Sequence, residues 1–455
     1  MTAMHFPNEI AQRWSRVGCA CLWFAVVGIP IHAQAPPARK SPAKTSPAPA
    51  SREKDDPLAP ILQQANDAVD KMDFAAALDP LQKYIAQRPE EAYAHFQLGY
   101  AYAGLKREAD AKSEFSRAIA LDPKMAAAYQ NLGLVSLDDD PAAAAAAFLH
   151  AADLQPAESR PRFLAGFALE HSGKLSEAAE QYRAALALSP NGYEEHFALG
   201  RVLLRSNDAA AAEEQFRAAL AARADAAPAR LGLASALSAQ KKYEAASDAL
   251  AEYLKLNPGN RSAHFDRASA LLNLNRLDDA LSELDRADSG AAPTAESLKM
   301  RGEIFLQQRK WKEAADTLKQ ELALSPQDSD SAAWIGHADI ELRDYPAAVE
   351  ILTQIHTKNP QNAEVLRDLS NAFYLSESYG PALEAMDRLA KLETPPPESW
   401  FVRAICYDKL LRKAEAIEAY QKFLDLDGGR HDTQDFQARH RIPVLQKELG
   451  PSRNR

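Results

Sequence analysis

Three histidines stand at equivalent places in the chain and are the first residues to test for chemistry. They are His95, His196 and His264, separated by 101 and then by 68 positions. Imidazole is a common metal ligand, and a metal site needs its ligands to converge. These histidines fall in different units of the repeat described below, so one ion cannot reach all three. We interpret them as packed, structural side chains. The sequence has no His-Glu-x-x-His and no paired Cys-x-x-Cys, so we predict no metal site.

Catalytic groups of other kinds are also missing. Cys406 follows Ala404 by two residues, on the side of a predicted helix that faces inward, so we interpret it as a small core residue. No Gly-x-Gly-x-x-Gly, Gly-x-x-x-x-Gly-Lys-Ser/Thr or Gly-x-Ser-x-Gly occurs. Phosphate-binding loops and the hydrolase nucleophile turn are therefore absent. The many carboxylates lie on solvated helix faces and single out no acid–base pair. We predict no catalytic residue, no cofactor and no enzyme activity.

Prolines recur at a fixed spacing through most of the chain. Pro89 and Pro123 are 34 residues apart, Pro156 and Pro190 are 34 apart, and so are Pro326 and Pro360. A period of this length is typical of stacked helical hairpins, in which each unit buries its apolar face against its neighbours. Such chains present a long surface, and proteins with a surface of this kind usually bind other molecules rather than catalyse reactions.

A fixed set of residue types recurs within each period and carries a resemblance. From residue 92 onward these are Leu98-Gly99, Tyr102, Ala111, Phe115, Ala118 and Pro123. The order and spacing resemble the tetratricopeptide repeat, with His95 in place of the first aromatic. Small residues permit close approach where two helices cross, the large ones form an apolar stripe, and proline separates one hairpin from the next.

The small residues form two columns along the chain. The first column contains Gly99, Gly133, Gly166, Gly200, Ala234, Ala268, Gly302, Gly336, Ser370 and Ala404. The second contains only alanine, at 111, 144, 178, 212, 246, 280, 314, 348, 382 and 416. With a degenerate first unit, these columns define eleven units. They start near residues 58, 92, 126, 159, 193, 227, 261, 295, 329, 363 and 397. The resemblance implies an all-α, right-handed α-solenoid of about eleven helix-turn-helix hairpins.

The beginning of the chain has the pattern of an export signal. Arg13 and Arg16 precede an apolar run over residues 17–31, which is short for a membrane-spanning helix. We expect residues 1–33 to be a signal peptide of bacterial type and the protein to be exported, periplasmic or secreted. The alternative is an uncleaved anchor through residues 17–31 that tethers the protein to a membrane and leaves it facing outside.

The remaining boundaries follow from composition. Residues 34–57 are rich in Pro and Ala and predict a flexible linker. Residues 58–430 hold the repeat array. Residues 431–455 predict a C-terminal capping helix and tail, with a helix break at Pro443. The linkers around 289–293 and 394–397 are the places where the array is expected to bend.

Charge and resemblance together indicate the class of partner. The formal net charge of −10 argues against nucleic acid, because phosphate binding needs an excess of Lys and Arg on one face. In tetratricopeptide proteins the ligand usually lies in a concave groove lined by the first helix of each hairpin. Position by position, this resemblance assigns to the groove Phe96, Tyr100, Phe163, Phe167, Phe197, Arg201, Phe265, Lys299, Arg367 and Asn371.

The function implied is a non-catalytic scaffold or adaptor that binds a protein or peptide in this groove. The export signal indicates a component of the cell envelope. Aromatic rings also stack on sugars, so the alternative is a polysaccharide-binding component of an export or envelope-assembly system. The sequence names no particular partner.

Overall fold

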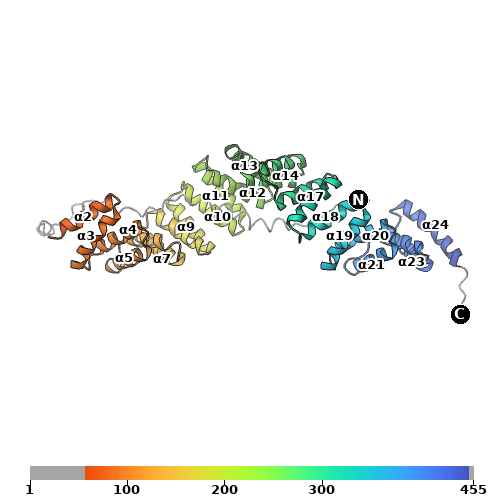
Figure 1. Ribbon diagram of the computed structural model, residues 1–455, viewed down its shortest axis with the longest axis horizontal. Coiled ribbons are helices and arrows are strands. Elements are labelled where there is room, and N and C mark those ends of the chain that lie inside the picture. Colours follow the sequence, from red (N-terminus) through yellow and green to blue (C-terminus); the bar gives the residue numbers. More distant parts are fainter. Residues whose placement is uncertain (1–56, 450–455) are drawn as a thin grey trace. The chain divides into compact units, whose positions relative to one another are not determined.

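The computed structural model describes residues 57–449, and in that range every regular element is an α-helix. The predicted signal peptide, the predicted anchor and nearly all of the predicted linker lie outside the described residues. The chain divides into two compact units, with the boundary between Pro258 and Gly259. We call them unit 1 and unit 2 and describe each by itself (Figure 1).

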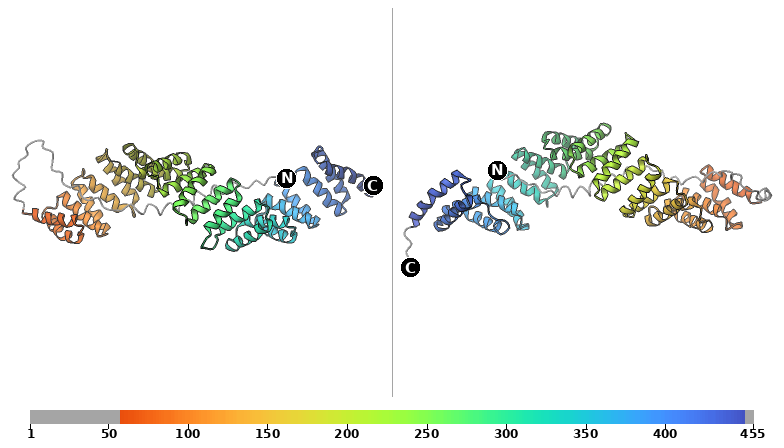
Figure 2. Two further views of the ribbon diagram at one scale, coloured as in Figure 1. Left: turned by 90° about the horizontal axis from the view of Figure 1, so that it is seen from above. Right: turned by 180° about the vertical axis from the view of Figure 1, so that it is seen from behind.

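Unit 1 contains six helical pairs. Its helices are α2 (Ala59–Asp70), α3 (Phe74–Gln87), α4 (Ala92–Gly104), α5 (Glu108–Leu121), α6 (Ala126–Ser136), α7 (Pro141–Leu154), α8 (Ser159–His171), α9 (Leu175–Leu188), α10 (Tyr193–Arg205), α11 (Ala209–Ala222), α12 (Ala227–Ala239) and α13 (Tyr243–Leu256). Within each pair the two helices pack side by side, and the second helix of one pair packs on the first helix of the next. Figure 2 shows this stacking from two further sides.

Unit 2 contains five pairs and a final helix. Its helices are α14 (Arg261–Asn273), α15 (Leu277–Ala287), α16 (Ala295–Gln307), α17 (Trp311–Leu324), α18 (Ser329–Glu341), α19 (Tyr345–Lys358), α20 (Ala363–Leu375), α21 (Tyr379–Leu389), α22 (Pro397–Lys409), α23 (Lys413–Asp427) and α24 (Asp432–Leu449). The two units together have the eleven pairs that the sequence predicts, and the prediction of an all-α solenoid is confirmed.

The two predicted columns of small residues lie where the helices of a pair cross. All ten alanines of the second column, from Ala111 to Ala416, are fully buried. In the first column, a β-carbon at Gly166 would lie 2.8 Å from the ring of Tyr182, and one at Gly336 would lie 2.6 Å from Leu352. Real β-carbons do not approach other atoms so closely. The close contact between the helices therefore depends on glycine at these positions.

In ten of the eleven hairpins the turn contains one residue with left-handed backbone. These residues are spaced by 34 through most of the chain and are Met72, Lys106, Gly173, Asn207, Lys241, Asn275, Arg309, Arg343, Glu377 and Leu411. Only one of them is glycine, although the left-handed region favours glycine. The unit that starts at Ala126 is one residue short, and its turn between α6 and α7 has no left-handed residue. The missing residue therefore belongs to this turn.

Two second helices end early, and both precede the linkers where bending is expected. Helices α15 and α21 have 11 residues, whereas α17 and α19 have 14. An arginine of the following first helix forms an ion pair with each short helix. Arg301 of α16 pairs with Asp285 of α15 at 2.7 Å, and Arg403 of α22 pairs with Asp387 of α21. Each arginine occupies the place where Leu98 stands in the first clear repeat. A charged link thus replaces apolar packing at both linkers.

The final helix packs on the last pair. Leu445 and Ala438 of α24 are fully buried with Phe423 of α23, and Arg441 reaches Asp408 at 2.7 Å. The helix runs through Pro443 without interruption, so the expected break is wrong. Proline has no N–H to give to the residue one turn earlier, but the apolar contacts on both sides of it hold the helix together.

Candidate functional site

The three histidines each bridge the two helices of their own hairpin. The His95 Nε2–H donates to the carbonyl of Pro89 at 3.0 Å, and its Nδ1 lies 2.6 Å from Glu114. His196 has equivalent contacts with Pro190 and Gln215, both at 2.9 Å. His264 lies 2.6 Å from Glu283. The carboxylate or amide oxygen always comes 19 residues later, on the second helix. Each of these histidines therefore links the first helix of its hairpin to the second.

No group of three or more His, Cys, Asp or Glu side chains in residues 57–449 is arranged to hold a metal ion. Burial raises the pKa of the Cys406 thiol to about 11, against the opposing effect of Arg403. A thiol with so high a pKa is protonated at neutral pH and is a poor nucleophile.

Positions five and nine of each first helix form one side of that helix, which we call the first-helix face. In unit 1, three of the predicted ligand contacts on this face are largely covered. The exposed fraction is 2% for Phe96 and 7% for both Tyr100 and Phe197. Phe96 packs against Tyr100 and Phe115, and Phe197 packs against Tyr193 and Phe216. These rings mainly join neighbouring helices, and their role as ligand contacts stays a prediction.

Phe163 and Phe167 of α8 differ, because each is only half-buried. They lie one helical turn apart and pack on the core of unit 1 with part of their surface still exposed. Leu134 of α6 and Leu231 of α12 are half-buried at the same positions of their helices. Helices α8 and α10 are in contact, as are α10 and α12. The first-helix face of unit 1 therefore offers apolar surface from several hairpins.

Arg201 of α10 is held by a buried carboxylate. Its Nη2 donates to Glu170 of α8 at 2.6 Å, and the same carboxylate accepts from Arg205 at 2.8 Å and from the hydroxyl of Tyr182 at 3.2 Å. Glu170 is nearly fully buried. Burial and the neighbouring Glu170 raise the pKa of Tyr182 well above its usual value, so its hydroxyl keeps its proton and donates. Arg201 thus fixes α10 against α8 beside Phe197.

Buried amides on the first helices are a feature that the sequence analysis missed. Gln97 of α4 donates to Asn66 of α2 at 3.0 Å and to the hydroxyl of Tyr93 at 2.6 Å. Gln130 of α6 donates to Gln155 at 2.6 Å. Within residues 57–449 neither amide oxygen accepts a hydrogen bond, and both residues are buried. The available signal was an amide side chain inside a mostly apolar helix, since such a helix is covered on most sides.

The first-helix face of unit 2 has charged residues on α16. Lys299 of α16 pairs with Asp328 at 2.7 Å and with Asp330 at 3.4 Å, and its ammonium lies 5.3 Å from the ring centre of Trp334. Burial raises the pKa of Glu303, one turn further along α16, and Lys299 opposes this shift. Phe265 of α14 is half-buried. Lys299 therefore joins α16 to α18 in the way that Arg201 joins α10 to α8.

The other two predicted residues in unit 2 lie on α20. Arg367 and Asn371 are exposed and one turn apart, and Arg367 pairs with Glu393 at 2.8 Å. Beside them, His337 Nδ1 of α18 lies 3.4 Å from the carboxylate of Asp368. This contact raises the pKa of His337, and burial opposes the shift. The structure places all ten predicted residues on first helices, six in unit 1 and four in unit 2.

The tetratricopeptide repeat family matches this sequence at residues 62–126, 138–193, 197–260, 234–296, 267–329 and 376–431. These matches together cover well over half of the chain. The protein therefore belongs to the tetratricopeptide repeat family, whose members are typically non-catalytic scaffolds for other proteins. No curated protein sequence matches the chain significantly. None of the helices in the described range is both long and apolar enough to cross a membrane.

Several solved structures resemble parts of the chain. YrrB, described as a TPR protein with an unusual peptide-binding site, is 21% identical with a TM-score of 0.38, over 41% of this chain and 96% of that one. MamA from Desulfovibrio magneticus RS-1 is 21% identical with a TM-score of 0.35, over 37% of this chain and 96% of that one. A chain of the APC/C hetero-tetramer Cut9–Hcn1 is 13% identical with a TM-score of 0.36, over 86% of this chain and 96% of that one.

Proposed function

We propose that this protein is an exported scaffold that binds an extended segment of another polypeptide along the first-helix face of unit 1. This binding requires no catalytic group, only contact sites at regular intervals on successive hairpins. Membership in the repeat family supports a protein-interaction role. The choice of unit 1 and of an apolar segment is our own inference from the residues on its face.

The observation that carries the proposal is the half-exposed pair Phe163 and Phe167 on α8. Phe163 packs on the buried Tyr182, with 5.6 Å between the ring centres, and both Phe163 and Phe167 keep part of their surface exposed. Aromatic side chains left partly exposed on a soluble surface commonly mark a binding site. Their spacing of one turn suits side chains of a partner laid across the helix.

Paired substitutions test this proposal. The protein is immobilised, and extract from its own source is passed over the wild type, a Phe163→Ala/Phe167→Ala variant and a Leu188→Ala control. Leu188 is an apolar residue at the end of second helix α9, and its side chain is more exposed than those of Phe163 and Phe167. We expect one polypeptide to be retained by the wild type and the control and lost from the double variant. Equal retention by all three proteins would contradict a role for the first-helix face.

The export part of the proposal rests on Arg13, Arg16 and the apolar run at 17–31. Residues 1–57 are fused to a reporter enzyme that is active only outside the cytoplasm. We expect reporter activity that disappears when charged residues replace part of the apolar run. Release of the reporter into the soluble fraction would indicate cleavage, and retention in the membrane fraction would indicate the anchor. An inactive reporter would refute export.

Protease treatment distinguishes a polysaccharide ligand from a polypeptide. A sugar that stacks on Phe163 and Phe167 would also be lost from the double variant. Treatment of the retained material with protease separates the two cases. Survival of the ligand would replace the polypeptide proposal with the polysaccharide one.

A further inference from the structure

The first helices in the middle of unit 1 are basic. Helices α8, α10 and α12 contain five arginines and three glutamates. The second helices of the same hairpins, α9, α11 and α13, contain seven acidic and three basic residues. The whole chain has a formal net charge of −10. A partner bound to these first helices therefore meets positive charge on a protein that is acidic as a whole.

Two of the arginines share one carboxylate. Glu170 of α8 accepts hydrogen bonds from Arg201 and Arg205 of α10 at 2.6 and 2.8 Å, and it is only 6% exposed. The side chains of Arg201 and Arg205 are 12% and 28% exposed. One carboxylate balances one of the two guanidiniums, and the other stays without a counter-charge. Taking a charge out of water is unfavourable unless an opposite charge compensates it, so this place favours an additional anion.

Arg205 has donors left for such an anion. Its side chain donates from Nη1 to Glu170 and forms no other hydrogen bond or ion pair within residues 57–449. A guanidinium has five N–H donors, and part of this side chain is exposed. Helix α12 contacts α10, and its one charged residue is Arg230. The acidic residues of α10 are Glu194 and Glu195 at its opposite end. No carboxylate of α10 or α12 therefore competes for the remaining donors of Arg205.

The guanidinium of Arg205 lies beside the half-exposed pair Phe163 and Phe167. Glu170 follows Phe167 by three residues, so the two side chains are neighbours on one side of α8. The hydrogen bond to Glu170 brings Arg205 of α10 to this turn of α8. Packed helices are about 8–10 Å apart, and an extended chain covers about 3.3 Å per residue. A segment laid across α8 and α10 therefore passes from the rings to Arg205 in about three residues.

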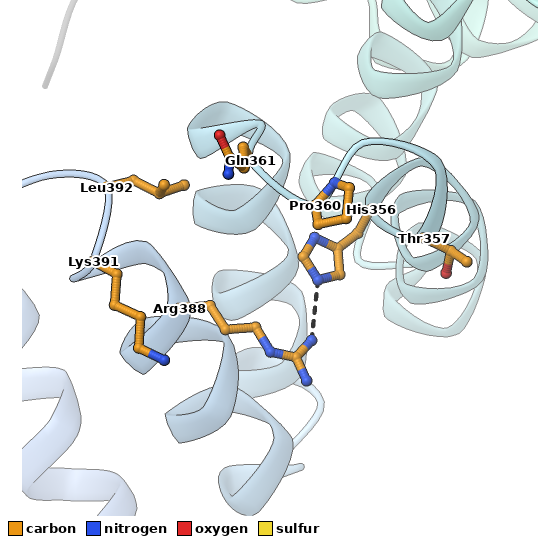
Figure 3. A pocket seen from close by; sticks show the side chains of 7 residues that line it. All are labelled: His356, Thr357, Pro360, Gln361, Arg388, Lys391 and Leu392. Carbon is orange, nitrogen blue, oxygen red and sulfur yellow. Dashed lines mark hydrogen bonds between the residues drawn. The ribbon is translucent and has the colours of Figure 1, made fainter.

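Basic side chains also gather in unit 2, at a pocket beside the ends of second helices α19 and α21 (Figure 3). There Arg388 donates to His356 at 3.0 Å, and within the described range neither Arg388 nor Lys391 forms an ion pair. Arg388 is exposed and has no carboxylate to orient it. It therefore serves as a comparison that has the same charge as Arg205 but lies on no first helix.

We propose that the segment bound by the first-helix face of unit 1 carries an acidic side chain about three residues from an apolar one. This inference rests on the proposed function and adds the chemistry of the partner to it. The carboxylate accepts from Arg205, while the apolar side chain lies on Phe163 and Phe167. It supplies the negative charge that Glu170 alone does not provide. Because the anion is a side chain, the end of the partner chain need not lie in the site.

Fluorescence anisotropy with three labelled peptides tests this on the whole protein. The peptides have both ends blocked and Phe-Leu at the centre, and they differ only at about three residues before and after this centre, where they carry glutamate, glutamine or lysine. We expect the glutamate peptide to bind at least about fivefold more tightly than the glutamine peptide, and the lysine peptide to bind most weakly. Added salt should weaken the glutamate peptide most. Equal affinities, a preference for lysine, or no binding of any peptide would overturn the inference.

Variants at two arginines locate the charge that the peptide recognises. Arg205→Gln should weaken the glutamate peptide at least about fivefold and leave the glutamine peptide within about twofold. Damage to the fold would weaken both peptides, so the comparison between them separates the two causes. Arg205→Lys keeps the charge and should restore part of the preference for glutamate. Arg388→Gln removes the same charge from unit 2 and should change neither affinity by more than about twofold. Equal effects of Arg205→Gln and Arg388→Gln would overturn the inference.

The extract experiment separates this inference from the proposed function. We expect Arg205→Gln to retain less of the polypeptide than the wild type, and Arg388→Gln to retain as much. Loss of the polypeptide from the Phe163→Ala/Phe167→Ala variant with full retention by Arg205→Gln would leave the polypeptide site standing and overturn the acidic side chain. Full retention by the double variant would contradict the proposed function and this inference with it.

Discussion

Gly133 of α6 and Phe148 of α7 approach so closely that a β-carbon at residue 133 would lie 2.7 Å from the ring. Phe148 is fully buried and packs in the core of unit 1, so the ring has no room to withdraw. Glycine is unfavourable inside a helix, and its presence here is explained by this contact alone. The same relationship links Gly99 to Phe115 and Gly166 to Tyr182.

Gly133→Ala should therefore destabilise the protein, by about 1–3 kcal/mol through overpacking. Gly259→Ala is the matched control, because a β-carbon added at Gly259 would have no other atom within 4 Å and the backbone there is not left-handed. There the reduced freedom of the unfolded chain should stabilise by about 0.4–1 kcal/mol. Urea unfolding of both variants measures whether each substitution raises or lowers the free energy of unfolding. A stabilising Gly133→Ala would show that the helices are not packed as described.

Leu411→Gly should stabilise the protein. Leu411 has φ of 59° in the turn between α22 and α23, and its side chain is 78% exposed. The substitution removes the steric cost of a left-handed leucine and loses little packing, for a net gain of about 0.5–1 kcal/mol. Leu410→Gly is the control, because that residue has φ of −83° and glycine there only adds flexibility. Thermal unfolding should show a higher melting temperature for Leu411→Gly and a lower one for Leu410→Gly. Shifts in the same direction would show that Leu411 is not strained.

The His337–Asp368 pair should make stability depend on pH. Asp368 raises the pKa of His337 in the folded state, and burial opposes the shift. Because the pKa of His337 is higher in the folded than in the unfolded chain, where it is about 6.5, the protonated histidine stabilises the folded state. This stabilisation is complete below the unfolded-state pKa and is lost as the pH rises through the folded-state pKa. Asp368→Asn should therefore lower the free energy of unfolding by about 0.5–1 kcal/mol more at pH 5.5 than at pH 8.5. Urea midpoints at the two pH values measure the difference. An equal cost at both would mean that the pair does not interact.

Cys406 should resist thiol reagents while the protein is folded. The thiol is fully buried, and burial raises its pKa to about 11. A Cys19→Ser/Cys21→Ser background leaves Cys406 as the one thiol. At pH 8 its modification should be at least about a hundredfold slower in buffer than in denaturant, because it requires local opening. Comparable rates would place Cys406 on an accessible surface and reopen a chemical role for it.

The sequence was sufficient to predict where the pairs begin, because a strict period fixes local structure. Helices α4, α10 and α16 start at Ala92, Tyr193 and Ala295, as the spacing predicts. The small columns could also be predicted, because a crossing point tolerates only small side chains.

Other features depend on details that a period does not contain. The left-handed residues include Met72, Lys106 and Glu377, whose side chains share nothing that marks the conformation. Phe96 and Phe163 occupy the same position of their repeats and each packs on the large ring of its second helix, but only Phe96 is almost fully covered. Helix α21 ends three residues earlier in its repeat than α19, and the sequence marks only the linker around 394–397 that follows it.

The central claim is that the first-helix face of unit 1 holds a polypeptide, and site-specific photo-crosslinking tests it most directly. Benzoylphenylalanine replaces Phe167 on α8 in one protein and Leu188 at the end of α9 in another, and both are irradiated in living cells. We predict that position 167 forms a covalent adduct with one polypeptide and that position 188 forms none. Adducts of equal yield at both positions, or adducts at 188 alone, would contradict the account.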